Sequence, residues 1–264
     1  MKVSEALRAL EAREARLLLA QATGLSEASV LAHPERELPA DAEARFLEFA
    51  ARRARGEPIA YILGMKEFYG LPLVVSPAVL IPRPETELLV ELALHQGFGL
   101  ALDLGTGSGA VALALKRHRP AARVVGVERS AAALAVAQGN ARRLGLEVEF
   151  RLGLWFEPAV GERFDLVVSN PPYVREGDPH LGEGDVRFEP RSALVAGPDG
   201  LESIRAIVRG APAHLNPGGR LLLEHGLGQD AEVRNLLRQS GLEDLDTWPD
   251  LAGIARVTGG GLKS

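Results

Sequence analysis

Residues 100–110 read Leu-Ala-Leu-Asp-Leu-Gly-Thr-Gly-Ser-Gly-Ala, and this stretch decides the fold. Leu100–Leu104 is a short apolar run of the kind found in buried strands. The three glycines that follow let the backbone turn sharply and approach a ligand closely. A helix is expected from Ala110 to Arg117, and its start would offer free backbone N–H groups at the turn. The stretch therefore predicts a strand, a ligand-binding turn and a helix in succession.

Strand and helix patterns continue to alternate on both sides of this turn. The expected strands are 100–104, 124–127, 148–152, 164–169, 220–224 and two more within 242–258. The expected helices are 85–95, 110–117, 131–144, 201–214 and 230–240. Alternation of this kind predicts an α/β fold with a doubly wound, mostly parallel seven-stranded sheet and helices on both faces.

The first third of the chain has a different character. Amphipathic helical patterns cover residues 3–22, 26–31 and 39–55, with polar faces and no catalytic pattern. Prolines then punctuate short apolar runs, and Phe68 to Val75 is typical of a β-hairpin interrupted at Gly70. We expect a small helical domain over 1–56, a hairpin and proline-rich linker over 57–86, and a catalytic domain over 87–264.

Composition narrows the kind of protein. The 264 residues carry a formal net charge of −5, which does not favour a large nucleic-acid surface, so no stable nucleic-acid partner is expected. The absence of cysteine excludes disulfides and thiolate metal sites, and the six histidines lack metal-ligand spacing, so no metal is expected. No apolar run is long enough for a signal peptide or a membrane span, which makes a cytoplasmic location the expectation.

The glycine turn fits two kinds of ligand. Gly105, Gly107 and Ala110 satisfy the G-x-G-x-x-A pattern of dinucleotide sites, so a nicotinamide or flavin site is an alternative. Asp103 before the turn instead suits a ligand with an ammonium and a sulfonium, and Glu128 stands where a carboxylate can bind ribose hydroxyls. We therefore favour S-adenosylmethionine, bound by Asp103, Glu128 and the turn residues Gly105, Thr106, Gly107, Ser108 and Gly109.

Asn170-Pro171-Pro172-Tyr173 follows the strand expected at 164–169. Ligands of open α/β sheets bind beyond the carboxyl ends of the strands, so this tetrapeptide should lie beside the glycine turn. The Asn170 side-chain oxygen and the Pro171 carbonyl can each accept a hydrogen bond, and the two prolines fix the backbone that presents them. Tyr173 can pack on a flat, conjugated group. Asn-Pro pairs are also common in plain turns, and the position at a strand end is what favours a functional role.

The two acceptors match the two hydrogens of an amide or amine NH₂ group. An amide nitrogen is a poor nucleophile because its lone pair is delocalised into the carbonyl. Hydrogen bonds to two acceptors would raise the electron density on nitrogen and aim its lone pair at the methyl donor. The donor's sulfonium supplies the electrophile and leaves as S-adenosylhomocysteine, so the transfer needs no metal. Alignment of the two reactants can contribute roughly 7–11 kcal/mol. We expect Asn170, Pro171 and Tyr173 to be catalytic, and 170–173 to bind the substrate.

With these motifs the chain resembles the release factor glutamine methyltransferases, a family of protein-(glutamine-N5) methyltransferases, over nearly its whole length. The most specific segment is Leu80-Ile-Pro-Arg-Pro-Glu-Thr-Glu87. Further segments that carry the resemblance are 56–64, 67–70, 189–190, 193–194, 197–201, 218–219 and 224–229.

The resemblance implies a substrate and a partner. The substrate would be the glutamine of the Gly-Gly-Gln loop in class 1 peptide chain release factors. The N-terminal helical domain would help to bind the release factor. It also implies that residues 105–109, Glu128 and Asn170 contact S-adenosylmethionine, and that Trp155 is the aromatic residue flanking it. Two positions depart from the family pattern: Glu128 stands where Asp is more frequent, and Leu154 where Asp is frequent.

Other functions remain open from the residues alone. Within methyl transfer, the alternatives are the glutamine of a ribosomal protein or the exocyclic amine of a nucleic-acid base, which would have to be flipped out of its helix. Outside it, the chain could be a dinucleotide-dependent oxidoreductase or a non-catalytic binding module. The intact glycine turn and Asn170 argue against a binding module that has lost its activity.

Overall fold

The computed structural model describes residues 1–263, which form two compact units. The first consists of Met1–Met65 and Gly182–Phe188, and the second of Lys66–Leu181 and the chain from Glu189 onward. Ser264, the last residue of the catalytic domain expected over 87–264, lies outside the described residues. Among the helices of the described chain, none is long and apolar enough to cross a membrane.

The first unit is helical, as expected. Its helices are α1 (Val3–Ala6), α2 (Ala12–Thr23), α3 (Glu27–Ala32), α4 (Ala40–Ala54) and α5 (Ile59–Leu63). The single helix expected over 3–22 is wrong, because the Glu11 carboxylate accepts the backbone N–H groups of Arg13 and Glu14 and starts a new helix there. The short α5, which ends at Gly64 in the left-handed conformation, was not expected.

A small apolar core holds this unit together. Leu18, Leu19 and Phe46 are fully buried in it. The segment 182–188 joins the unit through polar contacts, since Arg53 Nη1 lies 3.1 Å from Asp185 Oδ1. Arg53 also pairs with Glu14, so its charge is neutralised within its own unit.

The second unit contains the sheet that the alternating pattern predicts. Its strands are β3 (Leu100–Leu104), β4 (Arg123–Glu128), β5 (Glu149–Leu152), β6 (Phe164–Ser169), β7 (Leu215–Glu224), β8 (Glu243–Pro249) and β9 (Ala255–Gly261). They follow the spatial order β5-β4-β3-β6-β7-β9-β8. Only β9 runs antiparallel to its two neighbours, so the mostly parallel seven-stranded sheet is confirmed. The expected hairpin is formed by β1 (Met65–Phe68) and β2 (Leu71–Val74).

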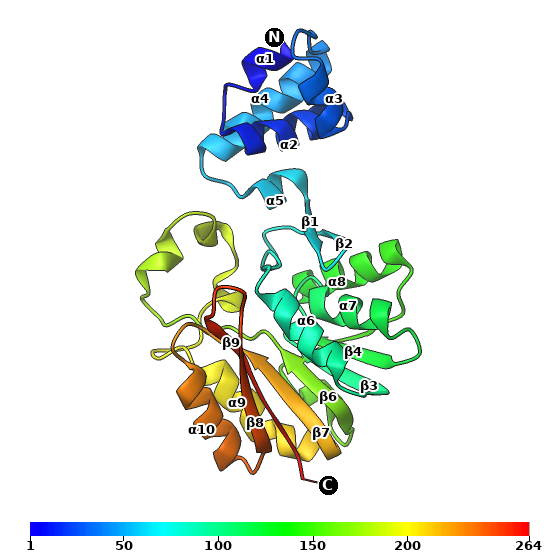
Figure 1. Ribbon diagram of the computed structural model, residues 1–264, viewed down its shortest axis with the longest axis vertical. Helices are drawn as coiled ribbons and strands as arrows, with labels where there is room; N and C mark the ends of the chain where they lie inside the picture. Colours follow the sequence, from blue (N-terminus) through cyan, green and yellow to red (C-terminus); the bar gives the residue numbers. More distant parts are fainter. Residues whose placement is uncertain (264) are drawn as a thin grey trace. The chain divides into compact units, whose positions relative to one another are not determined.

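Helices cover both faces of the sheet, which explains the continuous apolar runs in its central strands. On one face, α6 (Thr86–His95), α7 (Ala110–His118) and α8 (Ala131–Leu144) pack in the cluster that contains Ala101. On the other, α9 (Glu202–His214) and α10 (Asp230–Gln239) pack in the cluster that contains Leu102. Successive side chains of a strand point to opposite faces, so neighbouring residues enter different cores. Figure 1 shows the two helical layers.

The segment after Tyr173 has little regular structure. It contains the short 3₁₀ turns Pro179–Gly182, Val186–Phe188 and Arg191–Ala193. A further 3₁₀ turn, Glu157–Ala159, follows β5.

Candidate active site

The register of two parallel strands brings the two sequence motifs together. Leu104 of β3 is paired with Ser169 of β6, and the Ser169 hydroxyl donates to the Leu104 carbonyl at 2.6 Å. The residues that follow these two, Gly105 and Asn170, therefore leave the same edge of the sheet from adjacent strands. This confirms the expected location of the tetrapeptide beside the glycine turn.

The glycine turn is fixed from both sides. The backbone N–H groups of Gly105 and Thr106 both donate to the Val127 carbonyl of β4. Asp103 is 1% exposed, and its Oδ2 accepts the Thr106 hydroxyl at 2.6 Å and the Ala112 N–H at 3.1 Å. Burial raises the pKa of Asp103 to about 6, although these two hydrogen bonds oppose the shift. The carboxyl thus joins the strand, the turn and the first turn of α7.

Glu128 ends β4 and faces the same turn. Its Oε2 accepts the Gly107 N–H at 2.9 Å, and its Oε1 accepts the Ser130 N–H at 2.9 Å. Each carboxylate oxygen has a second lone pair. The side chain is therefore held in place and can still accept hydrogen bonds from a ligand's hydroxyl groups.

Trp155 adds a flat surface beside the turn. Its backbone has φ +49°, in the left-handed region that a bulky residue enters only at an energetic cost. A side chain at Gly105 would begin 3.6 Å from the Trp155 ring, so the indole lies directly over this glycine. Strain of this kind is found at ligand sites more often than elsewhere, which supports a role for the ring in binding.

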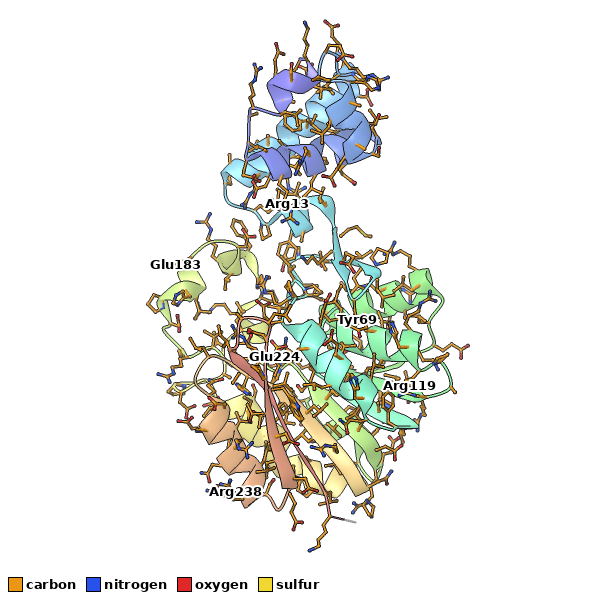
Figure 2. The ribbon with its side chains drawn as sticks, viewed as in Figure 1. Arg13, Tyr69, Arg119, Glu183, Glu224 and Arg238 are labelled. Atoms are coloured by element: carbon orange, nitrogen blue, oxygen red, sulfur yellow. The ribbon has the colours of Figure 1, made fainter. Side chains whose placement is uncertain are left out.

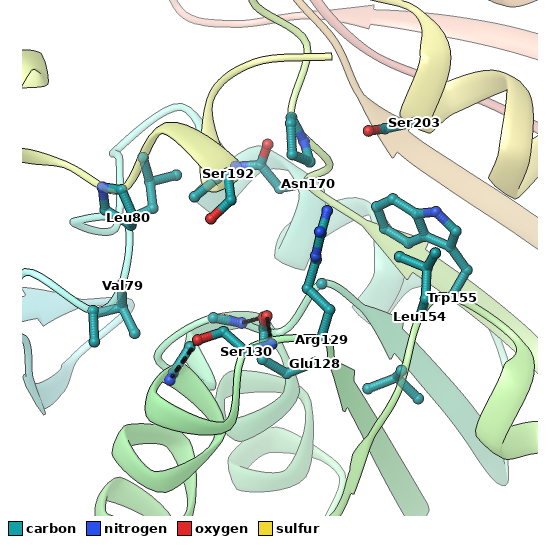
Figure 3. A pocket seen from close by; sticks show the side chains of 18 of the residues that line it. Val79, Leu80, Glu128, Arg129, Ser130, Leu154, Trp155, Asn170, Ser192 and Ser203 are labelled. Carbon is teal, nitrogen blue, oxygen red and sulfur yellow. Dashed lines mark hydrogen bonds between the residues drawn. The ribbon is translucent and has the colours of Figure 1, made fainter. Parts of the chain in front are cut away.

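Most of the predicted residues line one hollow. A pocket with about 760 Å³ of empty space, open mouth included, is lined in part by Gly105, Gly107, Glu128, Trp155, Asn170 and Pro172 (Figure 3). A smaller neighbouring hollow of about 430 Å³ is lined by Asp103, Thr106 and Ser108, and shares Gly105, Gly107 and Asn170 with the first. Gly109, Pro171 and Tyr173 line neither hollow in the described chain. Gly109 instead begins α7 with φ +84°.

Tyr173 is anchored by its polar groups and partly buried against apolar ones. Its hydroxyl donates to Glu224 Oε1 at 3.3 Å, and its backbone carbonyl accepts Gln229 Nε2 at 3.1 Å. Burial and the nearby Glu224 charge raise the pKa of the phenol. The ring packs against the core cluster of α9 and α10. Stacking of Tyr173 on the substrate amide therefore remains a prediction. The observed contacts indicate that Tyr173 helps to hold the tetrapeptide 170–173 in place.

Two residues near the site were not predicted as functional. Thr86 begins α6, and its hydroxyl accepts a hydrogen bond from Asn170 Nδ2 at 2.9 Å. Glu224 ends β7, is 1% exposed, and has its pKa raised by burial to about 7. Both belong to segments that carry the family resemblance, but no spacing in the sequence shows that they meet. Glu87 in the same segment accepts the Tyr69 N–H at 2.8 Å, which gives that carboxylate a structural role.

Family models and relatives match this chain along most of its length. Residues 2–64 match the PrmC N-terminal domain, and residues 84–183 match the methyltransferase small domain. A release factor glutamine methyltransferase of Burkholderia pseudomallei is 52% identical, covering 98% of this chain and 95% of the relative. An enzyme of the same description from Pseudomonas aeruginosa is also 52% identical, covering 92% and 89%.

Solved structures share the fold. A methyltransferase of Pyrococcus furiosus superposes with a TM-score of 0.59 at 20% identity, covering 81% of this chain and 98% of that one. A 16S rRNA N2 G1207 methyltransferase of T. thermophilus, solved with AdoMet and guanosine, gives a TM-score of 0.55 at 25% identity. That match covers 75% of this chain and 50% of the other.

Proposed function

The chain belongs to the release factor glutamine methyltransferase family, and from this we propose its substrate and the roles of its site residues. The enzyme transfers a methyl group from S-adenosylmethionine to the side-chain amide nitrogen of a glutamine. We propose that this glutamine lies in the Gly-Gly-Gln loop of class 1 release factors. Release factors work on the ribosome, so we also propose a cytoplasmic location.

The observation that carries the proposal is the placement of Asn170. It follows β6 at the strand edge where the glycine turn begins, and it lines both hollows. Its Nδ2 is engaged by Thr86, so the oxygen of its planar amide lies on the opposite side of that group. We propose that this oxygen and the Pro171 carbonyl accept the two hydrogens of the substrate amide.

The pocket residues fit the methyl donor. Glu128, held by two backbone N–H groups, is suited to accept the ribose hydroxyls. Trp155 offers a flat surface for the adenine, and the buried carboxyl of Asp103 favours a cationic group nearby. Bound S-adenosylmethionine supplies an electrophilic methyl group on its sulfonium. The protein's own contribution is to bind, orient and exclude water.

The same arrangement explains a preference for glutamine over glutamate. A glutamate carboxylate has no hydrogens to offer to the Asn170 and Pro171 oxygens. Unpaired buried polar groups cost about 1–3 kcal/mol each, and repulsion between carboxylate and acceptors adds to this. Discrimination against glutamate should therefore be strong without any editing step.

Radiolabelled S-adenosylmethionine and two purified class 1 release factors test the proposal. One factor is wild type, and the other has its loop Gln replaced by Ala. We expect label only in the wild-type factor, mapped to the loop by peptide mass spectrometry. Equal labelling of both factors would place the reaction elsewhere. Labelling of ribosomal proteins or RNA from purified ribosomes, and not of either factor, would replace the proposed substrate.

A further inference from the structure

A chain of buried and partly buried polar groups connects the ends of three elements behind Asn170. Asn170 Nδ2 donates to the Thr86 hydroxyl at the start of α6. A hydrogen bond from Thr86 in turn favours the charged form of Glu224 at the end of β7. The Tyr173 hydroxyl donates to the same carboxyl at 3.3 Å. Figure 2 labels Glu224 beside the first turn of α6.

The direction of these hydrogen bonds follows from the chemistry of the groups. Above about pH 7 the Glu224 carboxyl group is mostly ionised and can only accept, so the single hydroxyl proton of Thr86 then points at Glu224. The Thr86 oxygen can then only accept, and of the two ends of the Asn170 amide only Nδ2 can donate to it. If the amide were rotated by 180°, its oxygen would face the Thr86 oxygen with no proton between them.

We propose that Thr86 and Glu224 are positioning residues that fix which end of the Asn170 amide faces the substrate. With Nδ2 turned to Thr86, the Asn170 oxygen is presented to the substrate NH₂ group. In the opposite orientation a donor would face the substrate, and glutamate would fit better than glutamine. The inference rests on the proposed function, since it assumes that Asn170 accepts a hydrogen from the glutamine amide.

The burial of Glu224 supports a role beyond packing. The residue is 1% exposed, and its Oε2 has no hydrogen-bond partner among the described residues. A carboxyl group in such a place is costly, and a well-packed apolar side chain would avoid the cost. What the carboxylate provides is an acceptor for two hydroxyl donors, Thr86 on one side of the tetrapeptide and Tyr173 at its end.

Two substitutions at residue 86 isolate the hydroxyl. Thr86→Val keeps the shape of the side chain and removes the hydroxyl, whereas Thr86→Ser keeps the hydroxyl and removes a methyl group. Each purified variant is assayed for kcat and KM with a class 1 release factor, and for S-adenosylmethionine binding by calorimetry. A release factor with its loop Gln replaced by Glu is used as a competitive inhibitor. How strongly its carboxylate binds reports which end of the Asn170 amide faces the substrate. Thermal melting checks that both variants are folded.

We expect Thr86→Val to lose kcat roughly ten- to hundredfold, with donor affinity within about threefold of wild type. Thr86→Ser should stay within about threefold of wild type in kcat. The Glu-containing factor should inhibit Thr86→Val roughly tenfold better, relative to substrate KM, than it inhibits wild type or Thr86→Ser.

Unchanged inhibition across the three proteins would overturn the inference, even if Thr86→Val were slow. Equal kcat in Thr86→Val and Thr86→Ser would also overturn it, and would leave the proposed function standing as long as wild type methylates the factor. Absence of methyl transfer by wild type would remove the proposed function, and the inference with it.

Discussion

The Glu128 carboxylate accepts the backbone N–H of Gly107 at 2.9 Å, across 21 residues of chain. One contact therefore joins the end of β4 to the middle of the glycine turn. Because the Ser130 N–H holds the other oxygen, the carboxylate is oriented before a ligand arrives. Pre-orientation lowers the entropic cost of binding, so we expect this side chain to contribute strongly to donor affinity.

Replacing Glu128 should weaken donor binding according to the reach of the new side chain. Glu128→Ala removes the acceptors that we propose for both ribose hydroxyls and leaves the Gly107 N–H without its partner. We expect its Kd for S-adenosylmethionine, measured by calorimetry, to rise roughly tenfold to a hundredfold. Glu128→Asp keeps the charge on a shorter side chain and should fall between wild type and Glu128→Ala. Unaltered affinity in Glu128→Ala would exclude a role in binding the donor.

Asn170→Ala should separate binding from turnover. The variant loses the acceptor that we propose for the substrate amide but none of the Glu128 contacts, so donor Kd should stay within about threefold of wild type. We expect kcat to fall roughly a hundredfold or more, as for other preorganised polar groups at reacting centres. Asn216→Ala is the matched control, because Asn216 contacts Asp165 near the start of β6, at the other end of that strand. Equal turnover in the two variants would rule out the proposed role of Asn170.

Much of the fold could be predicted because it depends on local patterns. The central strands are apolar on both faces, α7 begins directly after Gly109, and α8 lies between the capping residues Ser130 and Gly145. The break before α2 could not be predicted, since it depends on the Glu11 carboxylate capping a helix inside a continuous amphipathic pattern. The short α5 has too few residues for a periodic pattern.

The candidate site was predictable only in part. The glycine turn, Glu128 and the tetrapeptide are local motifs at strand ends, and a parallel sheet brings such ends together. The contact of Asn170 with Thr86 spans 84 residues, and that of Tyr173 with Glu224 spans 51. The first pairing depends on how α6 packs over the sheet, and the second on how β6 and β7 pair. Neither arrangement can be deduced from the periodicity of the sequence.

Gly200 should be intolerant of a side chain because of where Tyr173 lies. A Cβ atom at Gly200 would meet the Tyr173 carbonyl oxygen at 2.3 Å, and the backbone has φ +77°. Gly253 is a matched control with φ +79° and no atom within 4 Å of the same position. Both Ala variants should lose about 1–2 kcal/mol of unfolding free energy for the left-handed backbone. Gly200→Ala should lose roughly 1–3 kcal/mol more and should also lose turnover, since the Tyr173 backbone must move.

Denaturant unfolding and methyl-transfer assays of both variants measure these effects. Gly253→Ala should retain wild-type turnover within about twofold. If the two variants were equally destabilised and equally active, the close approach of Gly200 to Tyr173 would have no influence on the site.

Glu224→Gln should stabilise the protein, and the gain should depend on pH. Burial raises the pKa of Glu224 from 4.5 to about 7, and the nearby charge of Glu85 contributes to this increase. Hydrogen bonds with Thr86 and Tyr173 and the charge of Arg256 lower the pKa and so oppose the increase. The neighbouring His225 is itself buried, and burial lowers its pKa.

Since the folded-state pKa of Glu224 is raised, its carboxyl group is neutral in both the folded and the unfolded state below about pH 4.5. It therefore costs no stability there. As pH rises from 4.5 to 7 the unfolded chain releases its proton first, so stability falls and then levels off above pH 7. The shift corresponds to at most about 3 kcal/mol.

We therefore expect the unfolding free energy of Glu224→Gln to exceed that of wild type by roughly 1–3 kcal/mol at pH 8 and by almost nothing at pH 4.5. Urea unfolding across that pH range measures the difference. Asp103, whose pKa is raised to about 6, adds a dependence of the same sign, but it is present in both proteins and cancels in the difference. A difference between the two proteins that stays constant with pH would show that Glu224 does not titrate in this range.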